Sequence, residues 1–233
     1  MTAIRLESVE ESATAAELFA LDENAPHMRL AAHPVWHAAL GGELPEARLK
    51  VLALRFYPVV AGPGRYAFAG KVSQIGREDG AKLFEALYQA THEKRADADQ
   101  GWRRLADALG VSARALDAER DNPSPEAADF LDVIRLHSVR GTPHEAAAVA
   151  WAIERQWPRL WGAFADSLTR HYKVKKPAVD WLLYEAGRAE RVEGFIAELV
   201  ARYILAAPPD IVYDARRAAR EAAWAWTALS ETV

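Results

Sequence analysis

Residues 142–172 read TPHEAAAVAWAIERQWPRLWGAFADSLTRHY, and this stretch decides the fold class. Thr142 is a preferred N-cap residue, Pro143 suits the first helical position, and Glu145 completes a capping box. Alanines and large apolar residues then recur with the 3.6-residue period of a helix. The stretch therefore predicts one long helix, which Pro158 should kink or deprive of one backbone hydrogen bond.

Glu154 falls on the apolar side of this predicted helix when residues are placed 100° apart. The residues that share its side are apolar: Ala147, Ala150, Trp157, Trp161 and Leu168. The charged residues of the helix lie on the opposite side: Arg155, Arg159 and Asp166. A buried carboxylate is costly unless it is paired, hydrogen-bonded, protonated or bound to a metal. Glu154 is therefore either half of an ion pair between helices or a carboxylate of a functional site.

The next predicted helix carries a second such acid, within residues 175–204, which read KKPAVDWLLYEAGRAERVEGFIAELVARYI. Glu185 shares its face with apolar residues: Ala178, Trp181, Val192, Ile196 and Leu199. Arg188 is within reach of an intrahelical ion pair, and Tyr184 beside this face offers a hydroxyl. Either Glu185 and Arg188 neutralise each other in the core, or these side chains line a pocket that holds a polar ligand.

Two weaker signals involve other polar residues. Glu93 lies at the edge of the apolar stripe of its predicted helix, and Gln100 follows seven residues later. His33 and His37 have the spacing of a metal-binding pair on one helix. Pro34 places His33 at the helix start, so the two imidazoles are not expected to align.

Helix signals dominate the rest of the chain, and no strand alternation of useful length occurs. Further helices are expected over residues 12–22, 29–40, 45–70, 79–97, 98–109 and 112–120, and after Ser124 and near Pro209. We therefore expect an all-α, single-domain bundle of about eight to ten helices. Its expected parts are a helical N-terminal extension (1–28), a core bundle (29–206) and a C-terminal helix (207–233).

The composition excludes several classes of protein. A chain of 233 residues with 51% hydrophobic content can bury one sizeable core, and its net charge of -4 without a basic block argues against nucleic-acid binding. The absence of cysteine excludes disulfides, thiolate metal sites and a cysteine nucleophile. No signal peptide and no membrane-spanning segment is expected, which favours a cytoplasmic protein. The expected partner is a small-molecule ligand, and a homodimer stays open.

Two stretches resemble the heme-oxygenase-like helical superfamily, which includes TenA-type thiaminases, the oxidase PqqC and iron-containing oxidases related to the chlamydial CADD protein. Residues 33–60, HPVWHAALGGELPEARLKVLALRFYPVV, are similar to the family's opening pair of helices. Residues 146–172 look like the segment that carries a glutamate before an aromatic residue and a proline. The resemblance covers most of residues 29–204 and implies a heme-oxygenase-like bundle.

In the iron-containing branch, the resemblance implies six metal ligands: a Glu, a His seven residues later, a second Glu, and a His-x3-Asp-x2-His set. The matching positions here are Glu93, Gln100, Glu154, Glu185, Ala189 and Val192. Alanine and valine cannot bind a metal, and di-iron centres prefer histidine and carboxylate ligands. No standard di-iron centre is therefore expected, and the cofactor left open is a single iron ion among Glu93, Glu154 and Glu185.

The resemblance implies an oxidase-like enzyme of the PqqC/CADD-like class that acts on a small metabolite in an interior pocket. The thiaminase branch uses a cysteine nucleophile, which this chain lacks, whereas the PqqC-like branch works without a metal. Two carboxylates in one dry cavity raise one pKa, which suits a general base. The catalytic candidates are Glu93, Glu154 and Glu185. The substrate-binding candidates are Arg188, Tyr184, Tyr57 and Gln100.

Two other interpretations stay open. The fold can persist in a non-catalytic protein that binds a ligand or a partner, since a fold does not decide a function. In the third interpretation, Glu154 and Glu185 pair with Arg155, Arg188 or Arg191 between helices. The interior would then hold no cavity larger than a water molecule or two.

Overall fold

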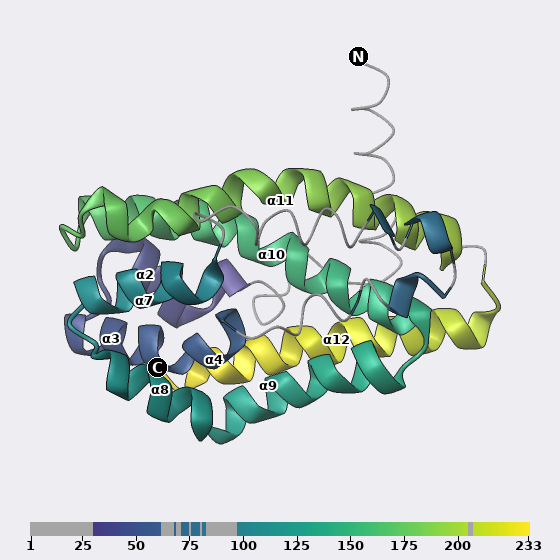
Figure 1. Ribbon diagram of the computed structural model, residues 1–233, viewed down its shortest axis with the longest axis horizontal. Coiled ribbons are helices and arrows are strands. Elements are labelled where there is room, and N and C mark those ends of the chain that lie inside the picture. The colour runs from purple at the N-terminus through teal and green to yellow at the C-terminus, as the bar shows by residue number, and fades with distance from the viewer. Residues whose placement is uncertain are drawn as a thin grey trace, which may run out of the picture.

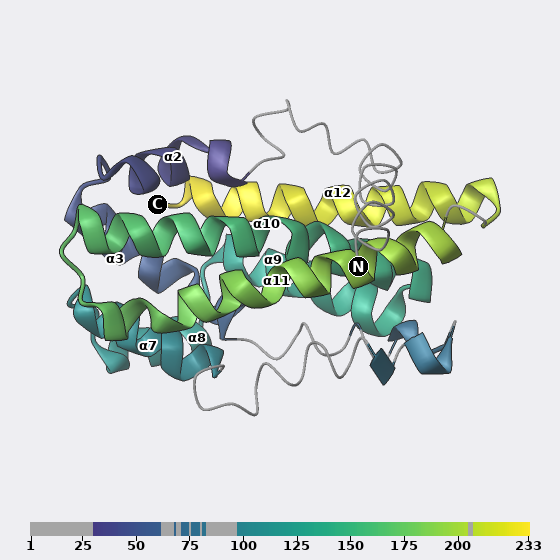
Figure 2. The same cartoon turned by 90° about the horizontal axis from the view of Figure 1, so that it is seen from above.

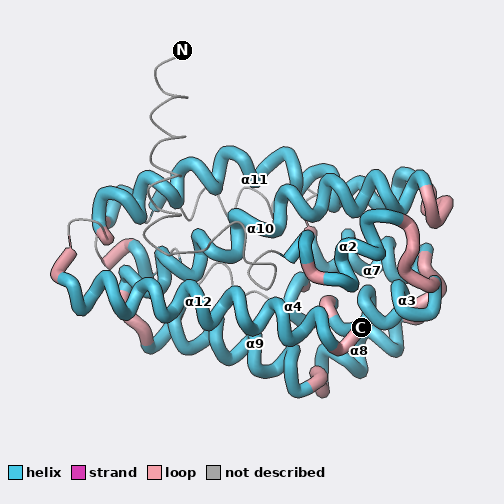
Figure 3. Tube along the Cα trace, turned by 180° about the vertical axis from the view of Figure 1, so that it is seen from behind, coloured by secondary structure: helices cyan, strands magenta, loops and turns pink. Residues whose placement is uncertain are grey.

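The longest helices lie along the long axis of the molecule, and several short helices gather at one end (Figure 1). The computed structural model describes residues 30–61, 68, 71–74, 76–79, 81–82, 97–204 and 207–233, apart from the side chains of 157–159 and 188–193. Across these ranges the regular structure is helical and no strand occurs (Figure 3). The predicted all-α class is confirmed.

Besides short helical pieces at 71–72, 77–79 and 81–82, the described ranges contain nine complete α-helices, one 3-10 turn and one π-helical segment. In chain order they are η2 (Leu30–Ala32), α2 (Pro34–Gly41), α3 (Glu46–Arg55), α4 (Tyr57–Val60), α7 (Ala98–Ala108), α8 (Ala113–Asp121), α9 (Pro125–Arg135), η3 (Leu136–Arg140), α10 (Pro143–Arg170), α11 (Lys176–Tyr203) and α12 (Pro209–Glu231). None of the described helices has both the length and the apolar character needed to cross a bilayer.

Helix α10 lies between α11 and α12 (Figures 1 and 2). A short turn joins α10 to α11, so the two helices run in opposite directions along their shared contact, which we call the α10–α11 seam. The two backbones approach closely at Gly162, where an added Cβ would lie 3.4 Å from the Cβ of Ala186. Helix α10 is therefore the central helix of the bundle, and α9 packs alongside α12.

Tryptophan rings join the short helices to the seam. Trp161 on α10 packs against Trp36 on α2, with 5.9 Å between ring centroids, and against Trp102 on α7, with 5.6 Å. Trp181 on α11 lies 6.2 Å from Trp161 and 6.0 Å from Trp102. Edge-to-face contacts add to the stabilisation that burial of these large rings provides. This cluster fixes α2 and α7 against one end of the seam.

Several predicted helix starts are confirmed. Thr142 caps α10, its hydroxyl accepts from the Glu145 N–H, and the Glu145 carboxylate accepts from the Thr142 N–H. Ser124 caps α9. The predicted helices near 98–109 and 112–120 correspond to α7 and α8, and α10 continues through Pro158.

The helix predicted over residues 45–70 is confirmed as helical up to Val60, but it is not continuous. It breaks at Phe56 into α3 and α4, because Pro58 has no N–H to donate to Leu54 and its ring crowds the preceding turn. Residues 62–67 of that range lie outside the described residues. So do the N-terminal extension 1–28, with its predicted helix 12–22, and residues 83–96 of the helix predicted over 79–97.

The helix predicted over residues 29–40 begins later, at Pro34, after the short turn η2. His33 is its N-cap, with an extended backbone (ψ 135°), and its Nδ1 accepts from the Val35 N–H at 3.3 Å. Burial lowers the pKa of this imidazole, which keeps it in the neutral form that can accept. His33 thus serves as a cap, as its position before Pro34 indicated.

Candidate functional site

Glu154 lies inside the bundle, as its position on the helical wheel predicted. Its exposed fraction is 2%, and its neighbours Trp151 and Ile153 on α10 are exposed by 0% and 4%. Trp161 and Leu168, on the predicted inner side, are fully buried, whereas Asp166 on the opposite side is exposed. Glu154 also makes polar or electrostatic contacts. The sequence therefore identified the inward acid of α10 correctly.

Glu185 is the corresponding inward acid of α11. It is 2% exposed, and Trp181, one turn before it, is 1% exposed. Tyr184 beside it is half-buried, and both Tyr184 and Glu185 make contacts of their own. The side chain of Arg188 lies outside the described residues. The structure thus places one carboxylate from each helix of the seam in the interior.

The two acids lie at different levels of the seam. The contact between Gly162 and Ala186 marks one level, and Glu185 is adjacent to it in the sequence. Glu154 precedes Gly162 by eight residues, which is about 12 Å of helix rise. A ligand that reaches both carboxylates must therefore lie lengthwise along the seam.

Tyr57 occupies a buried position where α4 meets α7. Its hydroxyl donates to Asp99, the Nε of Arg103 donates to the same carboxylate at 2.9 Å, and the Arg103 guanidinium lies 5.0 Å from the ring centroid of Tyr57. Burial, and then the bond to Asp99, raise the pKa of Tyr57 far above its usual range. The hydroxyl stays protonated and is committed to Asp99.

The other sequence candidates are not brought to the seam by described contacts. Gln100 is exposed on the first turn of α7, where its backbone N–H donates to Asp97 at 3.1 Å. Glu93 lies outside the described residues. The interior site therefore consists, in the described part of the chain, of Glu154 and Glu185 with Tyr184 at its side.

The residues present do not fit a di-iron centre. Ala189 and Val192 bring no ligand atoms, and Gln100, in the place of a histidine, faces solvent. Within the described ranges, no group of three or more histidine or acidic side chains is arranged to hold a metal ion.

A buried polar cluster around His137 had no signal in the sequence. His137, 2% exposed on η3, lies 2.9 Å from Glu221 on α12 through Nε2 and 3.7 Å from Glu145 on α10 through Nδ1. Arg217 on α12 lies 3.6 Å from Glu145. The capping box identified Glu145, but only the tertiary fold brings η3 and α12 to it. The cluster joins three elements.

In structure, the chain is similar to a TenA homolog from Pseudomonas syringae pv. tomato, with a TM-score of 0.70 and 12% sequence identity. The match covers 98% of this chain and 91% of that chain. No protein-family model matches the sequence, and no significant match exists among curated proteins. At this identity the likeness shows the fold alone, so the chain has a TenA-like helical fold.

Proposed function

We propose that the protein is a small-molecule enzyme, oxidase-like in the manner of PqqC- and CADD-like proteins, that works without a standard di-iron centre. The observation that carries this proposal is the burial of Glu154 on α10 and Glu185 on α11, each 2% exposed, on two helices that pack against each other. A core selected for packing alone favours apolar residues at both positions, because replacing buried ionic groups with apolar ones is often neutral or stabilising. The TenA-like fold supports the proposal, since helix bundles build sites from side chains that project inward from facing helices.

The chemistry that we assign to the two acids is proton transfer. A carboxylate within hydrogen-bond distance of a substrate can accept a proton in the transition state, and a second one can return it. The half-buried Tyr184, next to Glu185, would orient the substrate through its hydroxyl. Tyr57 would act through its ring or through Asp99, because its hydroxyl is already donated to that carboxylate.

An oxidation at this site needs an electron acceptor. In the proposed reaction, Glu154 or Glu185 removes a proton from an electron-rich substrate. The substrate then transfers two electrons to dioxygen and loses a second proton. The two electrons and two protons convert dioxygen to hydrogen peroxide, so the reaction balances without a resident metal.

A second candidate function is a non-catalytic protein that binds a small molecule in the same seam. The alanine and valine at positions 189 and 192 favour it, because these side chains remove ligand atoms that the iron-containing branch would need. Both functions predict a ligand that depends on the seam acids. They differ in whether that ligand is converted.

The test compares wild-type protein, Glu154→Gln and a matched control, Glu119→Gln, in a screen against a metabolite extract under air. Glu119 is also a buried carboxylate, but the Nη1 group of Arg55 donates to both of its oxygens, at 2.8 and 2.9 Å. We expect wild type and Glu119→Gln to deplete the same compound and to form hydrogen peroxide, and Glu154→Gln to lose both effects. Binding without depletion in wild type would support the second function.

Two outcomes would contradict the proposal. If Glu154→Gln keeps the activity and changes only the melting temperature, the acid is structural. Iron bound at one or two equivalents after anaerobic Fe(II) loading, and lost in Glu154→Gln, would replace the metal-free mechanism with a metal-dependent one. Mass spectrometry of the metal content decides this point.

A further inference from the structure

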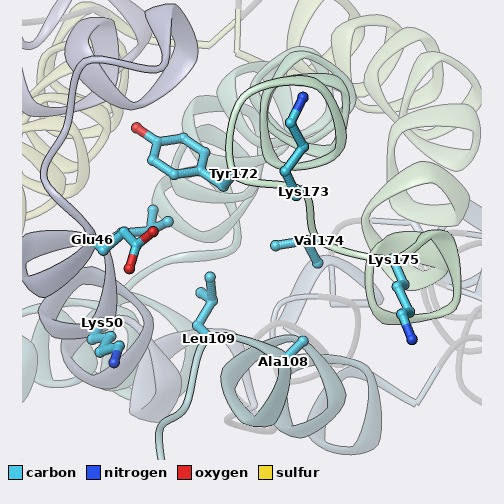
Figure 4. Close-up of a pocket in the computed structure, with 9 residues that line it drawn as sticks. Glu46, Lys50, Ala108, Leu109, Tyr172, Lys173, Val174 and Lys175 are labelled. Carbon is cyan, nitrogen blue, oxygen red and sulfur yellow. The ribbon is translucent and has the colours of Figure 1, made fainter.

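A cavity of about 360 Å³ lies at the turn between α10 and α11, away from the seam acids (Figure 4). Its wall comes from α3, the end of α7 and the turn itself. Lys175, at the far edge of the turn, precedes Glu185 by ten residues, which is about 15 Å along α11. The volume lies within the range of small-molecule sites in proteins. The cavity is thus a second place where a ligand fits, distinct from the proposed active site.

The wall of this cavity is held in place before any ligand binds. The Tyr172 hydroxyl donates to the Leu44 carbonyl at 3.0 Å and accepts from the Leu44 N–H at 3.1 Å. Val174 is 6% exposed, and its N–H donates to the Leu168 carbonyl at 3.0 Å. These bonds fix the turn on both sides of Lys173, whose φ of 58° is unusual for a residue other than glycine. The site is therefore preformed.

The charges around the cavity are mostly positive, although the whole chain carries a net charge of -4. Lys50, Lys173 and Lys175 line it against one acid, Glu46, which leaves two positive charges. The first turn of α11 holds no acidic residue that could neutralise them. Within the described part of the chain, Lys50, Lys175 and Glu46 make no ion pair, and the Lys173 ammonium donates to the Arg170 carbonyl at 2.8 Å.

The side chains give the cavity an apolar wall, one inward acid and a positively charged rim. Figure 4 shows the Glu46 carboxylate turned toward the cavity and the Tyr172 ring along its edge with the hydroxyl directed away, whereas the lysine ammonium groups point outward. Leu109 and Val174 supply apolar surface between them. A lysine stem is long and flexible, so the ammonium groups can close over an anion at the mouth. Glu46 repels an anion that enters deeper.

We propose that this cavity binds a phosphate monoester with a small apolar or aromatic body. A phosphate monoester carries about -1.5 to -2 charges at pH 7, which matches the two positive charges of the rim. Lysine binds phosphate as a mobile point charge. The body of the ligand then lies against Tyr172, Leu109 and Val174, and Glu46 keeps the phosphate at the rim.

Phenyl phosphate is the probe for the test, titrated by isothermal calorimetry at low salt against wild type and four variants. Lys50→Ala/Lys175→Ala removes two rim charges, and Arg135→Ala/Arg220→Ala removes two exposed charges on α9 and α12 as its matched control. Ala108→Phe fills the cavity from a lining position that is exposed. Glu154→Gln tests whether binding at this cavity is independent of the proposed active site.

We expect wild type to bind phenyl phosphate at least about tenfold tighter than inorganic phosphate, phenol or benzoate. The lysine double variant and Ala108→Phe should each weaken binding by about tenfold or more, and the arginine control and Glu154→Gln by less than about twofold. Absence of saturable binding by wild type would overturn the proposal. So would equal losses in both double variants, or benzoate or inorganic phosphate binding as tightly as phenyl phosphate.

Discussion

Two buried carboxylates, Glu119 on α8 and Glu154 on α10, have opposite surroundings. Glu119 is 8% exposed. Its carboxylate accepts hydrogen bonds from Arg55 on α3 and, at 3.1 Å, from the Ser124 N–H. Glu154 also makes contacts, but it lies in a central seam rich in alanine and tryptophan. An acid with an arginine aligned on it is explained by structure, since breaking such a pair is costly. We propose a functional role for Glu154, and the variants below test whether it is a structural acid as well.

The comparison also separates the two kinds of site proposed for this protein. Along the seam, Glu154 and Glu185 are buried, and we propose that they transfer protons on a ligand. At the turn between α10 and α11, the charges are exposed on flexible stems, and they suit recognition of an anion. The two proposals thus assign chemistry to the middle of this pair of helices and recognition of an anion to its end.

The largest expected loss of stability is at Gly101, where α7 packs against Trp181 of α11. An added Cβ would lie 2.3 Å from Cγ and 2.5 Å from Cβ of Trp181, and these atoms lie too close to the backbone to move aside. We expect Gly101→Ala to lower the free energy of unfolding by about 3 kcal/mol, measured by urea denaturation. An unchanged stability would mean that α7 is not packed tightly on α11.

The second effect tests the comparison of the two acids directly. Glu119→Gln keeps the shape of the side chain but removes the charge that faces Arg55, so we expect a loss of about 2 kcal/mol. If Glu154 serves the proposed chemistry, Glu154→Gln should cost less than about 1 kcal/mol, because a functional acid is placed for activity and not for stability. Urea denaturation of both variants gives the order. The reverse order would make Glu154 the structural acid and Glu119 the one to explain.

A third buried acid, Asp79, sharpens the comparison through its pH dependence. It accepts from the Tyr203 hydroxyl at 2.6 Å and from Arg202 at 2.9 Å, and the Tyr203 bond, followed by Arg202, holds its pKa below the usual 3.8. A depressed pKa stabilises the fold above the unfolded-state value, and this contribution is lost as the pH falls through the lowered pKa.

We therefore expect Asp79→Asn to cost about 1 kcal/mol at neutral pH, where the carboxylate of the wild type is ionised. The difference between the two proteins should shrink as the pH falls below about 4. Urea denaturation at a series of pH values measures it. A difference that stays constant over the whole series would show that the charge of Asp79 plays no part.

The smallest effect is a gain in stability at Gly187, in the middle of α11. A Cβ added there meets no atom within 4 Å, and the position is exposed. Since alanine favours the helix over glycine, Gly187→Ala should raise the free energy of unfolding by about 0.5–1 kcal/mol. It serves as the control for Gly101→Ala, because the substitution is the same and the surroundings differ. A loss of stability would show that something packs on this face.

The local features of the fold followed from short sequence signals. Ser124 and the Thr142 capping box each start a helix where predicted, because a cap depends on atoms within a few residues. The period of the apolar residues placed Glu154 and Glu185 inside. The break at Phe56 was missed, since the apolar run around it has the same period on both sides and only Pro58 marks the interruption.

By itself, then, the sequence determined the all-helical class, the start of most described long helices and the inward direction of the two seam acids. These depend on propensity, capping and periodicity, which act over one or two turns of helix. Only the tertiary structure decided that Tyr57 is committed to Asp99, that Glu221 reaches His137, and that Lys50 shares a cavity with the α10–α11 turn. Such contacts join residues far apart in the chain, and their geometry is set by how whole helices pack.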